Sequence, residues 1–300
     1  MMHKSGYVAI VGLPNAGKST LLNALMGQKL AITNVKPQTT RKRILGILTE
    51  KDYQIIFLDT PGIIEPSYLL QEKMMGEVEQ SFNDADIILL LIDAAEDPQG
   101  KKSLTHEFVK MSLSRENKNI ILIINKVDLV KQEEATNLLN YFEDLNLFKS
   151  SVLVSALHGF NIEKLIETVV ENLPEGPSFY PDDVIANENE RFFVSEIIRE
   201  KILELYREEI PYSTEVIIPE FKERENAKDF ISAEIVVERE SQRKIIVGKD
   251  GKSIKQLGKI AREAVEEFLQ GKIFLELRVK VRSKWRSDEN WLKNFGYGNE

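Results

Sequence analysis

The first residues with recognisable chemistry form a glycine-rich stretch that follows an apolar run and precedes a segment of helical character. Residues 12–19 fit the spacing G-x-x-x-x-G-K-[ST] directly after the apolar residues 8–11. In such a strand-to-helix turn, backbone N–H groups and the positive end of the helix dipole converge on phosphate oxygens. Lys18 would add a charge between the β and γ phosphates, and Ser19 would offer a hydroxyl to Mg²⁺. The predicted phosphate-binding residues are Gly12, Leu13, Pro14, Asn15, Ala16, Gly17, Lys18, Ser19 and Thr20.

Two later loops carry residues that suit a metal ion and a terminal phosphate. In the loop 36–41, a threonine can give its hydroxyl to Mg²⁺ only while the γ-phosphate holds the loop in place. The segment 59–62 ends an apolar run, where Asp59 would hold Mg²⁺ through water and the Gly62 N–H would meet the γ-phosphate. Taken alone, an aspartate at a strand end is more often a helix cap or a turn residue. The residues predicted around the metal and the γ-phosphate are Thr40, Asp59, Thr60, Pro61, Gly62 and Ile63.

The tetrad at residues 125–128 indicates which base accompanies the phosphates. The Asp128 carboxylate can accept two hydrogen bonds along one edge, which matches the N1–H and 2-amino donors of guanine. Adenine offers no such pair and would leave a buried carboxylate unpaired. The ligand is therefore predicted to be GTP or GDP. The residues predicted at the base end are Asn125, Lys126, Val127, Asp128, Ser155 and Ala156.

The composition is typical of a globular chain with two domains. Its 300 residues exceed the usual size of a single hydrophobic core, and 42% hydrophobic residues suffice to bury one in each domain. With no cysteine, the chain has no disulfide framework, thiolate metal site or cysteine nucleophile. No apolar run approaches the ~20 residues of a membrane span, and residues 1–6 lack the apolar core of a signal peptide. We therefore expect a cytoplasmic protein.

The charge of the chain is distributed unevenly. The net charge is −8, yet the stretch from Arg239 to Arg286 holds 14 Lys and Arg against 6 Asp and Glu. A basic segment on an acidic chain favours a localised surface for nucleic acid or another anionic partner. A solvated charged face is the alternative, unless a motif is found within the segment.

The elements that must position the first set of residues are apolar runs separated by helical segments. The runs lie at 7–11, 44–49, 55–58, 87–92, 120–124 and 152–154. This alternation predicts an α/β domain with a mostly parallel sheet, covered on both faces, that binds nucleotides at the carboxyl ends of its strands. A helical period over 161–173 closes the domain before Pro174, and a proline-rich extended stretch follows.

A second, smaller α+β domain is predicted after that stretch. We expect a helix that starts near Val194 and ends before Pro211, strands at 214–221 and 230–237, and a short apolar turn at 242–247. A helix at 253–269 and a strand at 273–281 with one basic face complete the domain. The order is therefore helix, strand, strand, helix, helix, strand.

Two glycines join the two central helices of this domain. A lone G-x-x-G usually marks a turn, but here it lies in a basic domain and resembles the loop of type II KH modules, which approach the backbone of about four single-stranded nucleotides. Glycine suits this role because a Cβ would block close approach. Ile245, Ile246 and Ile254 would form an apolar floor for bases, or belong to the core. The predicted RNA-binding residues are Gly248, Lys249, Asp250, Gly251, Lys252 and Lys255.

Taken in order, the motifs of the first domain resemble the five signatures of the translation-factor-like GTPases. This resemblance implies the Ras-like P-loop fold. Thr40 rather than Thr39 is the expected metal ligand, because it directly precedes Arg41 as in related families. The implied catalytic residues are Lys18, Thr40, Asp59 and Gly62, and the implied Mg²⁺ ligands are Ser19, Thr40 and Asp59.

Two positions bear on the mechanism. Ile63 stands where a Ras-like protein places a glutamine that orients the attacking water, so catalysis must rest on preorganised charge and slow intrinsic hydrolysis is expected. In related GTPases an asparagine at the position of Asn15 coordinates K⁺ beside the phosphates. A loop asparagine that stabilises its own turn is the alternative.

A Ras-like GTPase domain followed by a type II KH domain resembles the bacterial Era GTPases over nearly the whole chain. The resemblance implies binding to the 3′ end of small-subunit ribosomal RNA and assistance in assembly of the small ribosomal subunit. An RNA-binding scaffold in which GTP is mainly structural is the alternative. The chain departs from the family at Leu13, where arginine is common, and at residues 64–67, which lack the usual His-Lys pair.

The expected domain boundaries follow from these motifs. We predict a GTPase domain at 1–174, a linker at 175–190, a KH domain at 191–286 and a short tail helix within 287–300. In the tail, Trp291, Leu292 and Phe295 share one helical face, which we expect to pack on the KH domain. Peripheral contact with the inner membrane is the lesser alternative. We expect a monomer.

Overall fold

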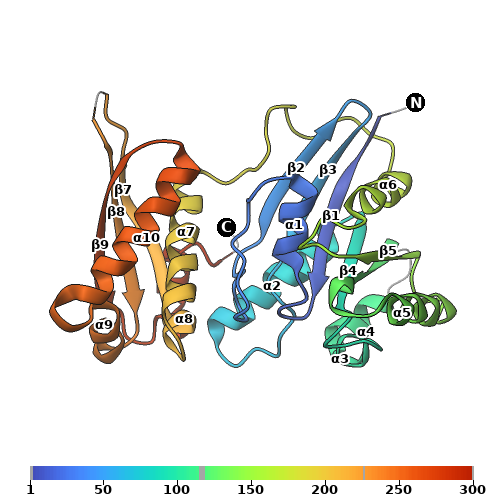
Figure 1. The fold of residues 1–300 in the computed structure, drawn as a ribbon, viewed down its shortest axis with the longest axis horizontal. Coiled ribbons are helices and arrows are strands. Elements are labelled where there is room, and N and C mark those ends of the chain that lie inside the picture. Colours follow the sequence, from blue (N-terminus) through green and yellow to red (C-terminus); the bar gives the residue numbers. More distant parts are fainter. Residues whose placement is uncertain (1–2, 115–118, 226, 299–300) are drawn as a thin grey trace. The chain divides into compact units, whose positions relative to one another are not determined.

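The chain forms two compact units. The computed structural model describes residues 3–114, 119–225 and 227–298, so the outermost ends of the predicted domains lie outside the described residues (Figure 1). The first unit comprises the residues up to Glu65 together with Met74–Asn187. The second unit comprises the residues from Glu188 onward together with the short segment Pro66–Lys73.

The first unit is built on a six-stranded sheet in the order β2-β3-β1-β4-β5-β6. Its strands are β1 (Lys4–Gly12), β2 (Ile44–Glu50), β3 (Tyr53–Asp59), β4 (Ile87–Asp93), β5 (Asn119–Asn125) and β6 (Ser150–Val154). Only β2 runs antiparallel to its neighbour; the other described pairs are parallel. The strands are nearly continuous apolar runs because helices bury both of their faces. The predicted mostly parallel P-loop sheet is confirmed.

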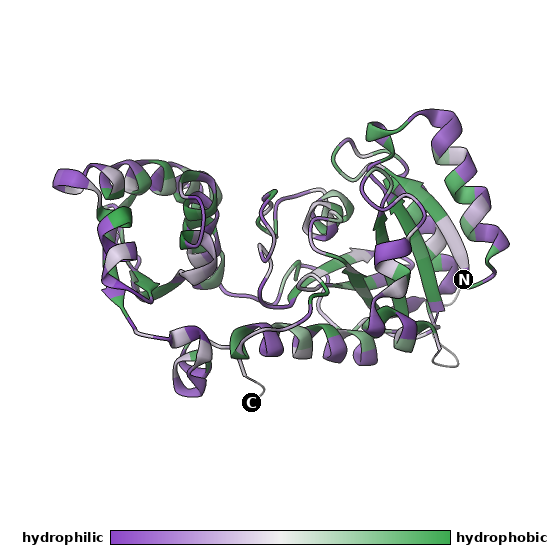
Figure 2. Cartoon of the chain, turned by 90° about the horizontal axis from the view of Figure 1, so that it is seen from below, coloured by the Kyte–Doolittle hydropathy of each residue, from purple (hydrophilic) through white to green (hydrophobic). Residues whose placement is uncertain are grey.

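Helices cover both faces of this sheet, whose green strands lie among the helices in Figure 2. The helices are α1 (Lys18–Met26), α2 (Leu69–Asp84), α3 (Lys101–Thr105), α4 (Glu107–Leu113), α5 (Gln132–Asp144) and α6 (Ile162–Asn172), with a 3₁₀ turn η1 (Val127–Leu129). Ala9 and Val11 of β1 share one core cluster with Phe82 of α2, Val109 of α4 and Phe142 of α5. The alternate residues of β1 point to the other face, where α1 packs.

The parallel register brings the carboxyl ends of the central strands to one edge. Ile10 pairs with Asp59, and Asp93 pairs with Asn125. The loops that follow β1, β3, β4, β5 and β6 therefore emerge side by side. This arrangement gathers motifs that are more than 100 residues apart in the sequence.

Most of the predicted linker lies along the first unit and is hydrogen-bonded to it. The Gln54 side chain accepts hydrogen bonds from the backbone N–H groups of Phe179 (2.7 Å) and Tyr180 (3.0 Å) and donates to the Tyr180 carbonyl (2.9 Å). The Ile47 N–H donates to the carbonyl of Ile185 at 2.9 Å. These bonds fasten residues 175–187 to β2 and β3, so the stretch belongs to the first unit. The predicted boundaries at 174 and 190 stay predictions.

The second unit packs helices against a three-stranded sheet in the order β7-β8-β9. Its elements are α7 (Glu190–Leu205), α8 (Ile210–Ser213), β7 (Glu215–Lys222), β8 (Asp229–Val237), α9 (Glu240–Val247), η2 (Lys249–Gly251), α10 (Lys252–Leu269), β9 (Ile273–Val281), η3 (Trp285–Ser287) and α11 (Glu289–Asn294). β7 and β8 are antiparallel, whereas β8 and β9 are parallel. The stretch predicted as an apolar turn at 242–247 is helical, because it is part of α9. The predicted smaller α+β domain of KH type is confirmed.

The predicted basic face of β9 is less basic than its own sequence suggests. Arg278 pairs with Glu276 at 2.9 Å, and Lys280 forms an ion pair with Glu234 of the neighbouring strand β8. Parallel pairing of β8 with β9 supplies that second carboxylate, and a reading of β9 alone could not include it.

The C-terminal residues pack into the second unit, as expected for the tail. Trp285 and Leu292 are fully buried, and the Trp285 indole N–H donates to the Ser213 carbonyl at 3.0 Å. Trp291 stacks on Phe295 with ring centroids 5.6 Å apart. Within the described part of the chain, no helix has the length and apolar character to cross a membrane.

Candidate functional site

The phosphate loop connects β1 to α1 through a backbone that requires glycine. Gly17 has φ 97°, and a Cβ there would lie 2.3 Å from Nδ2 of Asn125. A Cβ on Gly12 would lie 2.7 Å from the carbonyl oxygen of Leu91 in β4. The loop is therefore held against two neighbouring strands, with the N-terminus of α1 directed at its centre.

Lys18 lies buried in this loop. Its Nζ donates to the carbonyls of Gly12 (3.2 Å) and Leu13 (3.0 Å), and the residue is only 6% exposed. Burial lowers the pKa of Lys18 to about 8, although the nearby Asp59 carboxylate opposes the shift. An ammonium group with so little water around it would be stabilised by an anionic ligand.

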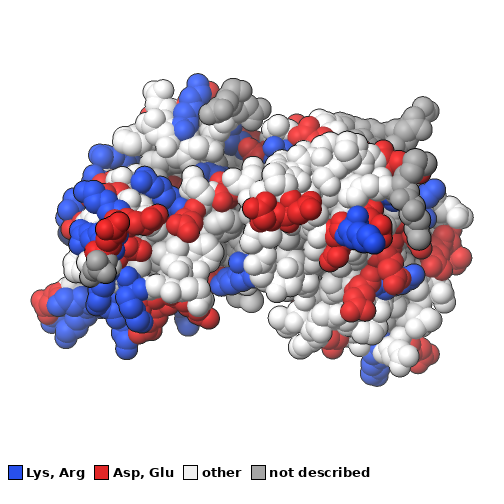
Figure 3. Space-filling view, turned by 90° about the horizontal axis from the view of Figure 1, so that it is seen from above, with Lys and Arg blue, Asp and Glu red and all other residues white. Residues whose placement is uncertain are grey.

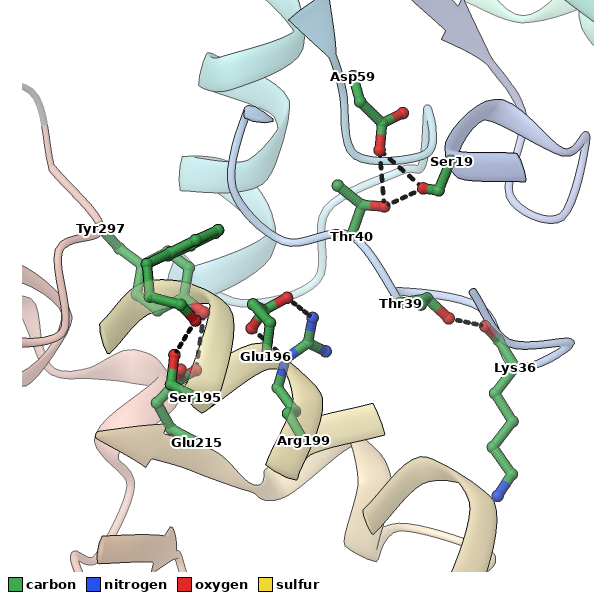
Figure 4. Close-up of polar contacts among 11 residues, drawn as sticks. Ser19, Lys36, Thr39, Thr40, Asp59, Ser195, Glu196, Arg199, Glu215 and Tyr297 are labelled. Carbon is green, nitrogen blue, oxygen red and sulfur yellow. Dashed lines mark hydrogen bonds and ion pairs between the residues drawn. The ribbon is translucent and has the colours of Figure 1, made fainter. Parts of the chain in front are cut away.

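Three oxygens from separate segments meet beside this lysine. The Ser19 hydroxyl donates to Oδ2 of Asp59 at 2.7 Å and lies 2.7 Å from the hydroxyl of Thr40, which is 3.4 Å from the same carboxylate oxygen (Figure 4). Burial raises the pKa of Asp59 to about 6, and its Oδ1 is buried with no hydrogen-bond partner. Two hydroxyls and a carboxylate with an unpaired buried oxygen fit the oxygen preference of Mg²⁺.

The two candidate threonines behave differently. The Thr39 hydroxyl donates to the carbonyl of Lys36 at 2.7 Å, whereas Thr40 is buried and turned toward Ser19 (Figure 4). The structure thus brings the threonine that was expected on sequence grounds to the oxygen cluster. In the described chain, no group of three or more His, Cys, Asp or Glu side chains could hold a metal ion. A magnesium ion at Ser19, Thr40 and Asp59 would therefore need oxygens from the nucleotide as well.

The loop after β3 places Gly62 and Ile63 in different roles. A Cβ on Gly62 would lie 2.9 Å from Cα of Pro14, so only glycine fits against the phosphate loop. The Ile63 N–H donates to the Gly12 carbonyl at 3.1 Å, while its side chain is 1% exposed and packs in the core. Ile63 thus stabilises the loop through its backbone, and its aliphatic side chain offers no group that could orient water.

Asn125 cross-links the phosphate loop to the loop after β6. Its Nδ2 donates to the Ala16 carbonyl at 2.8 Å, and its Oδ1 accepts from the Ala156 N–H at 3.0 Å. Asn125 is 2% exposed, so these bonds are protected from water. These bonds tie the end of β5, where the tetrad at residues 125–128 begins, to the phosphate loop.

The Asp128 carboxylate, which is predicted to select the base, is held in place by a neighbouring hydroxyl. Oδ1 of Asp128 accepts a hydrogen bond from the Ser155 hydroxyl at 2.5 Å. Lys126, with φ 64°, forms a 2.5 Å ion pair with Asp93 at the end of β4. Ser155 therefore acts as a support for Asp128, a role that the sequence pattern alone did not suggest.

These groups line one pocket of about 740 Å³ in the first unit. The predicted residues on its wall are Leu13, Pro14, Asn15, Ala16, Gly17, Lys18, Ser19, Thr20, Thr40, Gly62, Asn125, Lys126, Asp128 and Ala156. The predicted residues that do not line it are Gly12, Asp59, Thr60, Pro61, Ile63, Val127 and Ser155. Several of the latter support the wall from behind. For example, the Thr60 hydroxyl donates to the Ile10 carbonyl at 2.7 Å.

The pocket is also lined by residues that no sequence motif predicted. Val35, Leu129 and Leu157 line it, although they are 87%, 63% and 73% exposed. Further lining residues are Ile32, Thr33, Asn34, Lys36, Gln38, Thr39, Asp93, Glu96, Asp97, Lys102 and Ser103. The sequence did offer a signal for these three exposed apolar residues, because each lies within a few positions of a predicted motif residue.

The second candidate site is the turn between α9 and α10. Gly248 and Gly251 have φ 71° and 70°, and Asp250 between them has φ 55°. A Cβ on Gly248 would lie 2.6 Å from Cβ of Ser253, whereas one on Gly251 would meet nothing within 4 Å. Glycine is therefore required at position 248 by both packing and backbone conformation. At position 251 only the backbone conformation favours glycine, and the space around it is open for a ligand.

Lysines surround this turn. Lys249, Lys252 and Lys255 are among the residues around it, and in Figure 3 Lys and Arg side chains gather on the second unit, at the left of the view. Of the three isoleucines predicted as an apolar floor, Ile246 is fully buried and belongs to the core, whereas Ile245 is 50% exposed. The alternative assignment to the core therefore holds for Ile246, while Ile245 and the half-buried Ile254 stay predicted floor residues.

Comparison with known proteins identifies a family for a large part of each unit. Residues 7–126 match the family described as 50S ribosome-binding GTPase, and residues 209–286 match the KH domain. The chain is 46% identical to the GTPase Era of Geobacter sp. over 98% of both chains, and 46% identical to the chloroplastic GTPase ERA1 of Zea mays over 99% of this chain and 71% of that protein.

Two solved structures are also similar over the full length. A crystal structure of Era in complex with MgGDPNP and nucleotides 1506-1542 of 16S ribosomal RNA matches with TM-score 0.92 and 40% identity, covering 99% of this chain and 100% of that one. A crystal structure of an Aquifex aeolicus Era variant with one substitution, bound to GDP.AlF4-, matches with TM-score 0.91 and 40% identity over the same shares. The fold and the pocket define a P-loop GTPase joined to a KH domain. The chain belongs to the Era GTPase family.

Proposed function

We propose that this protein is a GTP-hydrolysing switch that binds small-subunit ribosomal RNA through its KH domain and assists assembly of the small ribosomal subunit. The observation that carries the proposal is one pocket that is lined by the Ser19 and Thr40 hydroxyls, which are hydrogen-bonded to Asp59 behind its wall, and by the Asp128 carboxylate. The same chain presents a glycine turn flanked by lysines in its second unit.

The pocket suits a guanine nucleotide. Asp128 would accept hydrogen bonds from N1–H and the 2-amino group of guanine, and Ser155 keeps its carboxylate in place. The Lys126 stem would lie along the base, while its ammonium group is anchored on Asp93. The Ala156 N–H already donates a hydrogen bond to Oδ1 of Asn125. This N–H group would therefore stabilise the loop after β6 rather than contact the ligand.

The hydrolytic chemistry would depend on fixed charge. Ser19, Thr40 and Asp59 would hold Mg²⁺, which, when bound, neutralises charge on the transferred phosphoryl group. Lys18 would hold its positive charge at the β and γ phosphates, and the Gly62 N–H would face the terminal phosphate. Because the Ile63 side chain is buried in the core, no glutamine-like group orients water from that position. Slow intrinsic turnover is the expected consequence.

The RNA partner is inferred from the second unit and from the relative solved with 16S ribosomal RNA. Lys249, Lys252 and Lys255 lie around the turn and would contact phosphates. The open space at Gly251 would admit the RNA backbone. Together these features support binding of a single-stranded ribosomal RNA segment.

The proposal is tested by measuring GTP turnover and RNA affinity on the full chain. Nucleotides 1506-1542 of 16S ribosomal RNA, the fragment bound in the solved relative, are titrated into the protein loaded with GDP or with a non-hydrolysable GTP analogue. A switch gives different dissociation constants in the two states. Equal constants would favour the alternative, an RNA-binding scaffold in which GTP is mainly structural, and absence of GTP hydrolysis would contradict the enzymatic assignment.

A potassium ion is a further candidate cofactor. Asn15 lines the pocket, is exposed and has φ 65°, a conformation that asparagine tolerates in turns. Both the K⁺ ligand and the simple turn residue fit this geometry. Turnover that stays the same when KCl is replaced by NaCl would exclude the potassium role.

The remaining partner assignments are a monomeric state and, as the lesser alternative, peripheral contact with the inner membrane. Leu292 and Phe295 are buried, and the half-buried Trp291 stacks on Phe295, which supports packing rather than lipid contact for the tail. Light scattering of the full chain tests the first assignment, and sedimentation with anionic vesicles tests the second.

A further inference from the structure

A buried tyrosine lies behind the glycine turn of the second unit. Tyr206 follows the last residue of α7, and its ring is 7% exposed within the second core. Its hydroxyl is 3.1 Å from the carbonyl oxygen of Ile246 and 2.8 Å from the hydroxyl of Ser253. Ile246 lies two residues before Gly248, and Ser253 lies two residues after Gly251. One hydroxyl thus contacts both ends of the turn.

The chemistry of the three groups fixes the direction of their hydrogen bonds. A carbonyl can only accept, so the Tyr206 O–H must donate to Ile246, and the Ser253 O–H must then donate to the Tyr206 oxygen. Burial raises the pKa of Tyr206, which keeps its proton in place. The Ile246 carbonyl is in the last turn of α9, where carbonyls have no partner within the helix. Loss of the phenol would therefore leave this carbonyl without that bond.

The turn needs such external support because its own backbone is strained. Asp250 has a left-handed φ of 55°, a conformation that non-glycine residues adopt only at an energetic cost. The Ser253 backbone and Cβ pack against Gly248 so closely that a Cβ at 248 would lie 2.6 Å from Cβ of Ser253. A group that holds Ser253 therefore also holds the first glycine of the turn.

We propose that Tyr206 is a positioning residue for the RNA-binding turn: its hydroxyl holds the end of α9 and the start of α10 at the separation that presents residues 248–251 to RNA. Tyr206 touches no RNA itself and acts through Ile246 and Ser253. This inference deepens the proposed function and rests on it for the identity of the ligand.

The test replaces the phenol by phenyl in the full chain. Tyr206→Phe keeps the buried ring and all the lysines, so RNA affinity is expected to fall about tenfold while the slope of affinity against salt concentration stays the same. GTP turnover without RNA should not change. The RNA probe is the fragment with nucleotides 1506-1542 of 16S ribosomal RNA.

A matched control separates positioning from general stability. Tyr297→Phe also removes a buried tyrosine hydroxyl of the second unit, one that donates to Oε2 of Glu215 at 2.7 Å (Figure 4). Tyr297→Phe is expected to lower the melting temperature and leave RNA affinity unchanged. Equal losses of RNA affinity in Tyr206→Phe and Tyr297→Phe would overturn the proposal.

A second measurement needs no RNA. Amide hydrogen exchange at Gly251, whose N–H donates to the Gly248 carbonyl at 3.2 Å, should become faster in Tyr206→Phe but not in Tyr297→Phe. Unchanged exchange at Gly251 would overturn the positioning role even if RNA affinity fell. If the wild-type protein did not bind the RNA fragment, the proposed function would fail, whereas the exchange result would still decide the role of Tyr206.

Ser253→Ala completes the design. If Tyr206 acts through Ser253, the double variant Tyr206→Phe with Ser253→Ala should lose little more RNA affinity than Tyr206→Phe alone. Additive losses would mean that the two hydroxyls act separately, which contradicts the proposed hydrogen-bond path.

Discussion

Two buried charged groups, Lys18 and Asp59, lie at the predicted nucleotide site, and burial opposes the charged form of each. Burial lowers the pKa of Lys18 to about 8 and raises the pKa of Asp59 to about 6, and each charge only partly offsets the effect on the other. A nucleotide phosphate with Mg²⁺ supplies the missing opposite charges. The folded protein therefore carries an electrostatic cost that ligand binding relieves.

Replacement of Lys18 should separate stability from activity. The pKa of Lys18 in the folded protein is below its ordinary value, so the unfolded chain is protonated at Lys18 first as the pH falls. The resulting loss of unfolding free energy is complete below about pH 8. We expect Lys18→Met to abolish GTP hydrolysis yet stabilise the nucleotide-free protein at pH 7, by on the order of 1–3 kcal/mol. In urea unfolding, the difference in unfolding free energy between Lys18→Met and the wild type should shrink as the pH rises from about 8 toward about 10. A less stable Lys18→Met protein at pH 7 would contradict this account.

The base preference depends on a single carboxylate. Asp128→Asn presents an amide donor where the carboxylate accepted, so GTP affinity should fall about 100-fold and xanthosine triphosphate should become the better ligand. The Ser155 hydroxyl can still donate to the amide oxygen, which keeps the side chain in place. Competition binding of the two triphosphates measures the change, and unaltered GTP affinity would refute the base assignment.

The elements supply rigid edges, and the chemistry lies on short loops between them. Gly17 and Gly62 permit contacts of the phosphate loop with Asn125 and with the loop after β3 that any Cβ would prevent. In the second unit, two helices meet at a turn whose shape depends on Gly248 and Gly251. Both sites thus have the same design, a left-handed backbone held between regular elements.

Gly251→Asp tests the turn at this level. Nothing lies within 4 Å of the Cβ position at Gly251, so the variant should fold, and its carboxylate would repel RNA phosphates. We expect RNA affinity to fall at least about tenfold and GTP turnover without RNA to stay nearly unchanged. Gly27→Asp is the matched control, because Gly27 has φ 64° and equally open space but caps α1 in the first unit. Equal RNA losses in both variants would point to backbone strain alone.

The chain continues directly from the γ-phosphate loop into the segment Pro66–Lys73, which belongs to the second unit. Within that unit, the Arg286 guanidinium lies 4.8 Å from the ring centroid of Tyr68 and pairs with Glu238 at 2.5 Å. Only three residues separate Gly62 from this segment. The stretch of chain between the predicted γ-phosphate contact at Gly62 and the second unit is therefore very short.

Thr40→Ala should uncouple the nucleotide state from RNA binding. Without its hydroxyl, the loop loses its bonds to Ser19 and Asp59, so the GTP-analogue and GDP forms should bind the RNA fragment with the same affinity. Thr39→Ala is the neighbouring control, since the Thr39 hydroxyl bonds to the Lys36 carbonyl away from the oxygen cluster, and it should preserve the difference. The idea fails if Thr40→Ala keeps a wild-type difference.

The main chemistry of this protein is predictable from its amino-acid sequence. The spacing of Lys18 and Ser19, the order of the later motifs and the glycines at 248 and 251 were sufficient to predict a guanine nucleotide, a parallel sheet and a KH-like turn, because these features depend on local backbone geometry and on side-chain type. The strand runs were also readable, since strands buried on both faces must be apolar throughout.

The folded structure was needed to identify the neighbours that each of these residues contacts. The folded structure placed Ser155 against Asp128, and Tyr206 against both ends of the glycine turn. It also paired Lys280 with Glu234 and reduced the basic face expected from β9 alone. Such contacts join residues that are distant in the chain, and no periodicity or local spacing encodes them. They form when strands pair in register and when buried polar groups pair with groups that the fold brings close to them.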